Sequence, residues 1–304
     1  MPDASHPQVV TYTADLSICS QICRLAVQEH NLTNAEDVAV DIEYAMDNYE
    51  PWFARLQPTM TVPVMCYGDR VIGDSKDILY FLAERHADRG LYPKAARAEI
   101  DKFIEAFYAR FMFIGIYPFG HLLQRSDGLK RFILHAKTDV TLAKLRTLVG
   151  DPELGDVARK KLAQMEHRDF SQLSDPGLLD KANTEVAGLV QMLEDRLLEG
   201  RSWVCGEAYT LADIVATALL ARVHFIQQEA LFTPTVRAYW QRLQARPSFT
   251  AANVCATWES TEMSRQFETF VPPADGGLTV LGGMTTRGGV PPMPREARSR
   301  TSPL

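Results

Sequence analysis

The sequence predicts an α/β unit followed by an all-helical unit, and three patterns indicate this fold class. Residues 8–87 alternate strand and helix signals in the order strand, helix, strand, helix, strand, strand, helix. Residues 95–260 instead carry apolar side chains at helical spacing through most of their length. A polar link at 87–93 separates the two patterns. The chain has 304 residues, which is long enough for two such domains.

The first strand and helix place a cysteine at a helix N-terminus. Residues 9–13 form an apolar run, and Ile18, Ile22 and Leu25 fall on one face of the helix that follows. Cys19 lies at the start of that helix, where unpaired backbone N–H groups and the positive end of the helix dipole favour a thiolate. The sequence therefore predicts a nucleophilic thiol with a depressed pKa. The alternative is a small buried cysteine without a chemical role.

Residues 61–82 predict a strand, a tight turn, a second strand and a helix. Proline removes a backbone donor, so Pro63 marks the start or a bend of the first of these strands. A cis Val62–Pro63 bond would turn the Val62 backbone N–H and C=O outward, toward an extended peptide ligand. Asp74 and Ser75 are expected to cap the next helix and to offer an anion site there. The alternative for this pair is a plain N-cap.

Within the helical half, two apolar stripes predict long helices, and a charged stretch separates them. The stripes are Ile100, Phe103, Ile104, Phe107, Phe111 and Ile114, and then Val186, Leu189, Val190, Leu193 and Leu197. Residues 122–178 carry many charges and have breaks at 150–152 and 175–177, so we expect extended or inserted helices there. Thr210 and Asp213 form a capping box at the start of an apolar core helix, and its expected role is structural.

Composition and charge exclude several classes of function. The chain is 46% hydrophobic and 23% charged, with a formal net charge of -6, and its basic residues are not clustered. General binding to nucleic acid or to an anionic membrane is therefore not expected. The most apolar stretch, 211–226, is interrupted by charges and too short to cross a bilayer.

The dispersed cysteines and the first residues of the sequence predict a cytoplasmic location. The five cysteines are dispersed, so neither a disulfide framework nor a metal site is indicated. Cys23 follows Cys19 by one helical turn, a spacing that suits packing rather than a disulfide. Residues 1–6 lack the features of a secretory signal, and we expect a reducing, cytoplasmic location. Residues 270–304 are rich in Pro and Gly, and we expect a disordered tail there.

Together these motifs resemble the glutathione S-transferase superfamily, and the resemblance covers most of residues 8–260. Ser17-x-Cys19-Ser20 with Arg24 looks like the S-x-C-S-x-x-x-R active-site motif of the zeta class. Residues 16–20, 41–51 and 55–56 are similar to the reductive dehalogenases of this Cys-type branch. The Thr210 capping box looks like the folding-nucleation box of the family.

The resemblance implies a thioredoxin-like, glutathione-binding domain at 8–87 and a helical-bundle substrate domain at 95–260. The catalytic residues that it implies are Cys19 and Ser17. The residues that it implies as contacts of the co-substrate glutathione are Ser20, Thr61, Val62, Pro63, Asp74 and Ser75. Many relatives have Glu or Asn at the position of Asp74. Asp keeps the negative charge of Glu, but its side chain is shorter. A small hydrophobic or aromatic electrophile is expected between the domains, with Tyr117, Phe119 and His121 as pocket residues, and the resemblance allows a homodimer.

Three functions follow from this resemblance. The first is reductive dehalogenation or thioether cleavage through a mixed disulfide between Cys19 and glutathione. The second is cis–trans isomerisation of a maleyl-type diacid, which needs cationic groups around the substrate carboxylates; Arg24 alone lies near the motif. The third is a non-catalytic scaffold, as in the ganglioside-induced-protein-like relatives. The identity of the electrophile is not encoded in these motifs, since many chemistries share the fold and the glutathione site.

Overall fold

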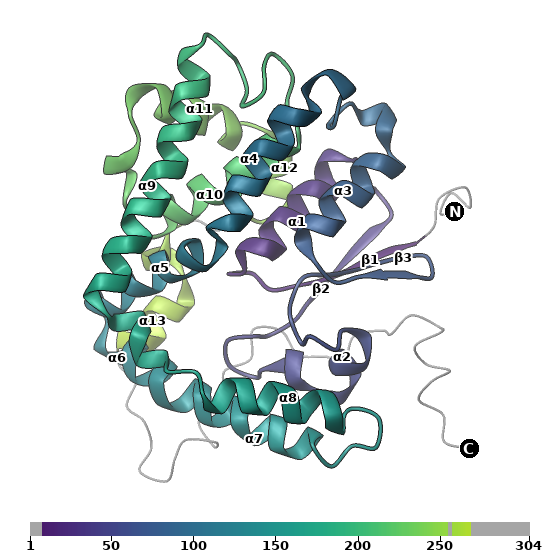
Figure 1. Ribbon diagram of the computed structural model, residues 1–304, viewed down its shortest axis with the longest axis vertical. Coiled ribbons are helices and arrows are strands. Elements are labelled where there is room, and N and C mark those ends of the chain that lie inside the picture. The colour runs from purple at the N-terminus through teal and green to yellow at the C-terminus, as the bar shows by residue number, and fades with distance from the viewer. Residues whose placement is uncertain (1–7, 255–256, 269–304) are drawn as a thin grey trace.

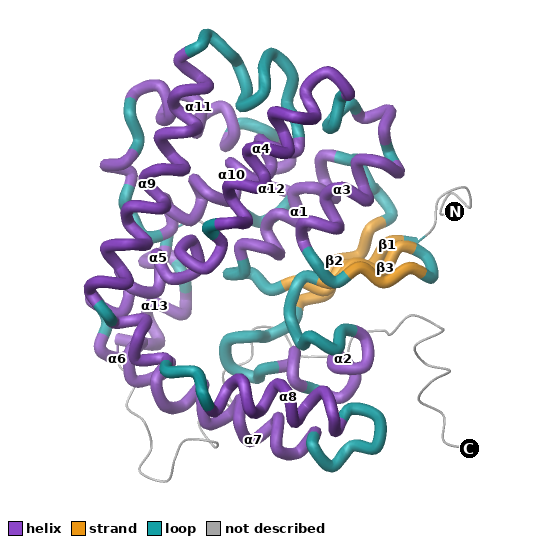
Figure 2. The backbone as a smooth tube through the Cα atoms, in the orientation of Figure 1, coloured by secondary structure: helices purple, strands orange, loops and turns teal. Residues whose placement is uncertain are grey.

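The computed structural model describes residues 8–254 and 257–268, and its first part is built on a four-stranded sheet. The strands are β1 (Val9–Thr13), β2 (Ala35–Ala39), β3 (Val64–Tyr67) and β4 (Arg70–Ile72), in the spatial order β2-β1-β3-β4. β1 pairs parallel with β2 and antiparallel with β3, and β3 pairs antiparallel with β4. Figure 2 shows this small sheet beside a much larger helical part. The predicted order of an α/β unit and an all-helical unit is confirmed.

Helices cover both faces of the sheet. α1 (Ile18–Glu29) and α3 (Ser75–Arg85) lie on one face, and α2 (Pro51–Leu56) lies on the other (Figure 1). Alternate strand residues separate two apolar clusters: Val9 and Met65 pack with α1 and α3, whereas Val10 and Tyr12 pack with α2. This alternation follows from the two-residue period of a strand, because successive side chains point to opposite faces.

The helical part surrounds one fully buried helix. α10 (Leu211–Phe225) is buried along nearly its whole length, while α4 (Arg97–Ala109), α5 (Phe111–Arg125), α9 (Pro176–Leu198), α11 (Pro234–Gln244) and the short α12 (Pro247–Ala251) and α13 (Glu262–Glu268) make up the rest. The predicted core helix and its capping box are confirmed, because Asp213 accepts from the Thr210 N–H at 2.8 Å. Asp213 also accepts from the Val204 N–H and the Tyr239 hydroxyl, so its carboxylate fixes three segments.

The first predicted stripe is divided between two helices. α4 ends at Ala109, and the Arg110 N–H bonds to the carbonyls of Phe107 and Tyr108. α5 begins at Phe111 and carries Ile114. The predicted apolar stripe is therefore interrupted at Arg110 and extends over two helices.

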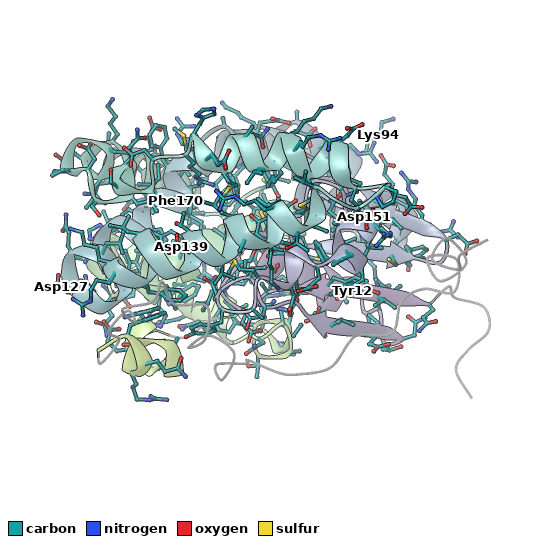
Figure 3. All side chains as sticks on the ribbon, turned by 90° about the horizontal axis from the view of Figure 1, so that it is seen from below. Tyr12, Lys94, Asp127, Asp139, Asp151 and Phe170 are labelled. Carbon is teal, nitrogen blue, oxygen red and sulfur yellow. The ribbon has the colours of Figure 1, made fainter. Side chains whose placement is uncertain are left out.

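The charged stretch between the stripes forms the inserted segment, which we define as residues 126–174. It contains α6 (Asp127–Arg131), a π-helical turn (Phe132–Lys137), α7 (Thr138–Leu148), α8 (Gly155–Glu166) and a 3-10 turn (Phe170–Ser174). Figure 3 looks onto α7 and α8 from below, with Asp139 early in α7 and Asp151 after its end, toward the sheet that carries Tyr12. The helices expected there are confirmed, and they contact the first domain near α2.

No helix within the described residues is long and apolar enough to cross a membrane. The tail predicted at 270–304 lies outside the described residues.

Candidate active site at the N-terminus of helix α1

The N-terminus of α1 presents Ser17 and Cys19 next to the start of α3. Ser17 is the N-cap, and its hydroxyl oxygen accepts from the Ser20 N–H at 3.3 Å. Cys19 is the second residue of the helix and is partly exposed. The Ser75 hydroxyl from α3 hydrogen-bonds to its thiol, and Arg222 from α10 lies close enough for its charge to act on it. Three elements that are distant in sequence therefore meet at one sulfur.

The predicted depression of the Cys19 pKa is wrong for the unliganded protein. Burial removes the thiolate from water and raises the pKa of Cys19 to about 11. The Asp74 carboxylate raises it further, while the Ser75 hydrogen bond and the Arg222 charge lower it. Desolvation is thus the largest contribution, and the unliganded site holds a protonated thiol at neutral pH.

The loop before β3 provides an unpaired stretch of backbone. The Val62–Pro63 peptide bond is cis, as predicted. Within the described part of the chain, the Val62 N–H and C=O have no hydrogen-bond partner, and the Val62 side chain is half-buried. Thr61 is exposed, and its hydroxyl shares a hydrogen bond with Thr59 at 2.8 Å. This loop can therefore pair with an extended peptide.

Asp74 and Ser75 begin α3. Asp74 is an exposed N-cap, and its Oδ1 accepts from the N–H groups of Lys76 and Asp77 at 2.8 and 3.4 Å. The cap therefore forms as expected, and the second carboxylate oxygen remains available. Ser75 is only 1% exposed, and its hydroxyl lies 2.8 Å from the hydroxyl of Tyr108 on α4. Tyr108 was not among the predicted site residues.

Two residues of the motif are structural. Ser20 is fully buried, and its hydroxyl accepts the Ala14 N–H at 3.1 Å, so the prediction that it contacts a ligand is wrong. The cause is the rotation of about 100° per helical residue, which turns Ser20 toward the end of β1 while Cys19 points out. Arg24 is 6% exposed and donates to the Ala252 carbonyl at 2.7 Å and to the Thr13 hydroxyl at 3.0 Å. It therefore joins α1 to α12 and is not the cation that the isomerase alternative requires.

An apolar cavity of about 200 Å³ adjoins the N-terminus of α1. Its apolar lining includes Ile114, Pro118, Phe119, Leu122, Phe132 and Trp258. The polar groups on its wall come from Ser17, Glu43 and Arg222. Glu43 forms an ion pair with Lys137 at 2.6 Å, whereas the Arg222 guanidinium donates to the Leu16 carbonyl at 2.7 Å and packs over the Phe225 ring. Because Arg222 also acts on Cys19, it connects the thiol to the cavity.

Of the three predicted pocket residues, only Phe119 lines this cavity. Tyr117 is buried against the ring of His121, and the Nε2 of His121 lies 2.8 Å from the Asn183 Oδ1 on α9. The prediction for Tyr117 and His121 is thus wrong for this cavity. These two residues share the face of α5 that packs on α9, while Phe119 lies on the other face.

Sequence reasoning missed Arg222 and Trp258. Arg222 had a usable signal, because a charged residue within an apolar, buried helix needs a specific reason to be there. Trp258 had none, since its place in the wall depends on how residues 257–268 pack against α5 and α10.

The comparisons with known proteins agree with this geometry. Residues 16–85 match the family model of the glutathione S-transferase N-terminal domain, and residues 170–247 match that of the C-terminal domain. The chain belongs to the glutathione S-transferase superfamily. Within that superfamily, it is 29% identical to the tetrachloro-p-hydroquinone reductive dehalogenase of Sphingobium chlorophenolicum, over 83% of this chain and 98% of that protein.

Two further similarities are to a human protein and to a solved structure. The human ganglioside-induced differentiation-associated protein 1-like 1 is 26% identical, over 82% of this chain and 76% of that protein. The solved structure of the beta-etherase LigF from Sphingobium sp. strain SYK-6 superposes with a TM-score of 0.60 at 18% identity, covering 84% of this chain and all (100%) of that one. The latter likeness supports the fold.

Proposed function

We propose that this protein is a glutathione-dependent reductase or thioether-cleaving transferase that acts on an aromatic or otherwise apolar electrophile. The observation that carries the proposal is the partly exposed Cys19 thiol next to an apolar cavity. Arg222 lines this cavity, and its charge also acts on the thiol. The sequence similarity to a reductive dehalogenase supports the same class of chemistry.

Glutathione is proposed to lie along the loop before β3. Its cysteinyl backbone pairs with the N–H and C=O of Val62, and its γ-glutamyl ammonium meets the Asp74 carboxylate. The γ-glutamyl carboxylate then faces the N-terminus of α3 at Ser75, where backbone N–H groups favour an anion. In this pose the sulfur of glutathione lies near Ser17 and Cys19.

The proposed reaction uses two glutathione molecules. The first thiolate forms a carbon–sulfur bond to the electrophile as halide or an aryloxide leaves, which gives a glutathionyl thioether. The Cys19 sulfur then attacks the sulfur of that thioether as its thiol loses its proton. The carbon–sulfur bond breaks, and the carbon takes a proton in turn. A second glutathione thiolate attacks the mixed disulfide, releasing glutathione disulfide and Cys19. The two glutathione thiols supply the two electrons that the substrate gains, and they are oxidised to glutathione disulfide.

The cavity favours a single substituted ring. An engineered apolar cavity of about 150 Å³ holds benzene, so about 200 Å³ fits a ring with small substituents. Arg222 would favour a substrate that carries an acidic oxygen such as a phenolate, since a cation on an apolar wall stabilises a nearby anion. The proposed substrate class is therefore a halogenated or aryl-ether phenol.

The decisive experiment compares wild type with Cys19→Ser on halogenated hydroquinones and β-aryl ethers. Addition of glutathione needs only the bound glutathione thiolate, whereas release of the reduced product needs a protein thiol. We expect Cys19→Ser to consume substrate and one glutathione and to accumulate the conjugate, as detected by mass spectrometry. Cys66→Ser is the matched control, because Cys66 is buried in the opposite sheet layer.

The alternatives give different products in the same assay. Wild-type product formed at wild-type rate by Cys19→Ser would contradict the mixed-disulfide mechanism and favour conjugation or isomerisation. No turnover of any electrophile by either protein would favour the scaffold.

Isomerisation of a maleyl-type diacid is the second candidate, and Arg222 is the observation that favours it. Arg222 lines the cavity, and its positive charge would attract a substrate carboxylate bound there. Turnover of maleylacetone that depends on Arg222 and survives Cys19→Ser would support this candidate.

A further inference from the structure

The inserted segment contacts the first domain through pairs of opposite charge. Lys137 binds Glu43 at 2.6 Å, and Lys144 binds Glu50. Arg55 of α2 in turn binds Asp151 at 2.6 Å, at the turn between α7 and α8. Each of these contacts neutralises a charge at the interface between α7–α8 and residues 41–60.

Lys161 and Arg168 depart from this pattern. Among the described residues, neither forms an ion pair with a carboxylate. Lys161 is half-buried, and its ammonium donates to the Thr59 carbonyl at 3.1 Å. Burial and the charge of Arg168 both lower the pKa of Lys161, so the two cations lie near each other. Two neighbouring cations without a described carboxylate partner make a region that favours an anion.

The two cations lie near residues 48–60, which lead to Val62. The Arg168 charge also acts on Tyr49, and Asn48 donates to the Met60 carbonyl at 2.9 Å. The Oδ1 of Asn48 is buried without a hydrogen-bond partner in the described structure. The cationic region therefore lies beside residues 59–61.

The proposed pose of glutathione leads toward this region. β4 is antiparallel to β3, and Met65 pairs with Ile72. Continuing this register by two residues places Asp74 near Pro63, at the open end of the hairpin. A tripeptide with its γ-glutamyl group at Asp74 and its cysteinyl group on Val62 continues toward Thr61 and Thr59. Its glycyl carboxylate then approaches the Lys161 ammonium, which is bound to the Thr59 carbonyl.

We propose that Lys161, assisted by Arg168, binds the C-terminal carboxylate of glutathione, so that the inserted segment completes the co-substrate site. This inference rests on the proposed function. Both residues lie between the ranges 16–85 and 170–247 that the two domain models match, so the contact would come from a part of the chain outside those models.

Calorimetry of two ligands tests the proposal. Wild type and Lys161→Gln are titrated with glutathione and with its glycyl ethyl ester, in which the terminal carboxylate is neutral. We expect Lys161→Gln to weaken glutathione binding roughly tenfold, which is about 1.4 kcal/mol, and to leave ester binding nearly unchanged. Wild type should prefer glutathione over the ester by a similar factor.

Three variants serve as controls. Lys160→Gln removes the neighbouring exposed charge and should change neither affinity. Lys161→Arg keeps the cation and should retain the preference for glutathione. Arg168→Gln changes an exposed side chain, leaves the Lys161–Thr59 contact intact, and should reduce the preference by a smaller factor.

The outcomes separate this inference from the proposed function. Wild-type binding of glutathione and ester with equal affinity, or an equal loss for both ligands in Lys161→Gln, would overturn the carboxylate assignment while glutathione binding stands. Absence of any glutathione binding to wild type would overturn the proposed function itself.

Discussion

At the scale of the residue, Cys19 shows that burial can reverse the effect of position. The sequence places this thiol at a helix N-terminus, which is confirmed, and helix position alone predicts an acidic thiol. In the folded protein, burial and the Asp74 carboxylate raise the pKa of Cys19 by more than the Ser75 hydroxyl and the Arg222 charge lower it. The predicted location was therefore right and the predicted pKa was wrong.

We expect slow alkylation of Cys19 in the unliganded protein. With a pKa raised to about 11 by burial, its rate with iodoacetamide should keep rising well above pH 9. Peptide mass spectrometry over a pH series measures this rate for Cys19 separately from Cys205. A midpoint at or below the ordinary value of about 8.5 would contradict the desolvation argument.

Other single residues were predictable only where the signal is local. Val62–Pro63 was identified because proline restricts its own backbone, and the cis bond is present. Arg222 and Tyr108 were missed because each reaches the site from a helix far along the chain. Their proximity to Cys19 and Ser75 is a result of packing, which no local pattern records.

At the scale of the element, helix faces decided which motif residues reach the site. On α1, Cys19 is partly exposed while Ser20 and Arg24 point into the protein. On α5, Phe119 faces the cavity while His121 faces α9. The sequence identified both helices. Which face of each helix is covered by a neighbouring element depended on how the helices pack together.

The start of α3 combines a capping role with the proposed binding role, and Asp74→Ser separates them. Serine is also a good N-cap, so the free energy of unfolding should change by less than about 0.5 kcal/mol. Loss of the carboxylate should weaken glutathione binding by about 1.5–3 kcal/mol, because a charged hydrogen bond is removed. Asp74→Ala removes both functions and should also cost about 1 kcal/mol of stability.

Calorimetric titration and urea unfolding of the same samples measure the two effects. Equal glutathione affinity in wild type and Asp74→Ser would remove Asp74 from the proposed site.

At the scale of the whole molecule, buried polar side chains join the two structural parts. Arg24 reaches from α1 to the carbonyls of Ala252 and Asn253, and Arg222 reaches from α10 to the Leu16 carbonyl. The inserted segment adds ion pairs to residues 43–55 from the π-helical turn, from α7 and from the turn that follows α7. The candidate site therefore depends on contacts between parts that are remote in sequence.

His30, at the end of α1, predicts a loss of stability in acid. It is 1% exposed, its Nδ1 lies 2.7 Å from the Ala26 carbonyl, and its Nε2 is buried without a partner in the described structure. Burial lowers its pKa to about 4, with the nearby His86 and Arg89 acting in the same direction. Between about pH 6.5 and pH 4 the unfolded chain binds this proton and the folded protein does not, so stability falls as the pH falls.

The expected loss from this group is about 3 kcal/mol by pH 4. Urea unfolding of wild type and His30→Gln at a series of pH values measures it as a difference, which cancels the other titrating groups. The difference should be constant above pH 7 and should shift in favour of the variant below pH 6. A difference that is independent of pH would contradict the buried neutral state.

The sequence by itself determined the order of the elements, the capped starts of α3 and α10, the positions of Cys19 and of the Val62–Pro63 turn, and the extra helices of the inserted segment. These features depend on periodicity, capping and backbone restriction, which act over a few residues. Only the tertiary structure decided that Arg222 rather than Arg24 lines the cavity, that burial raises the pKa of the Cys19 thiol, and that Lys161 lies beside the loop before Val62. Desolvation and charge at a site are set by neighbours from other elements, and those neighbours are fixed only when the chain packs.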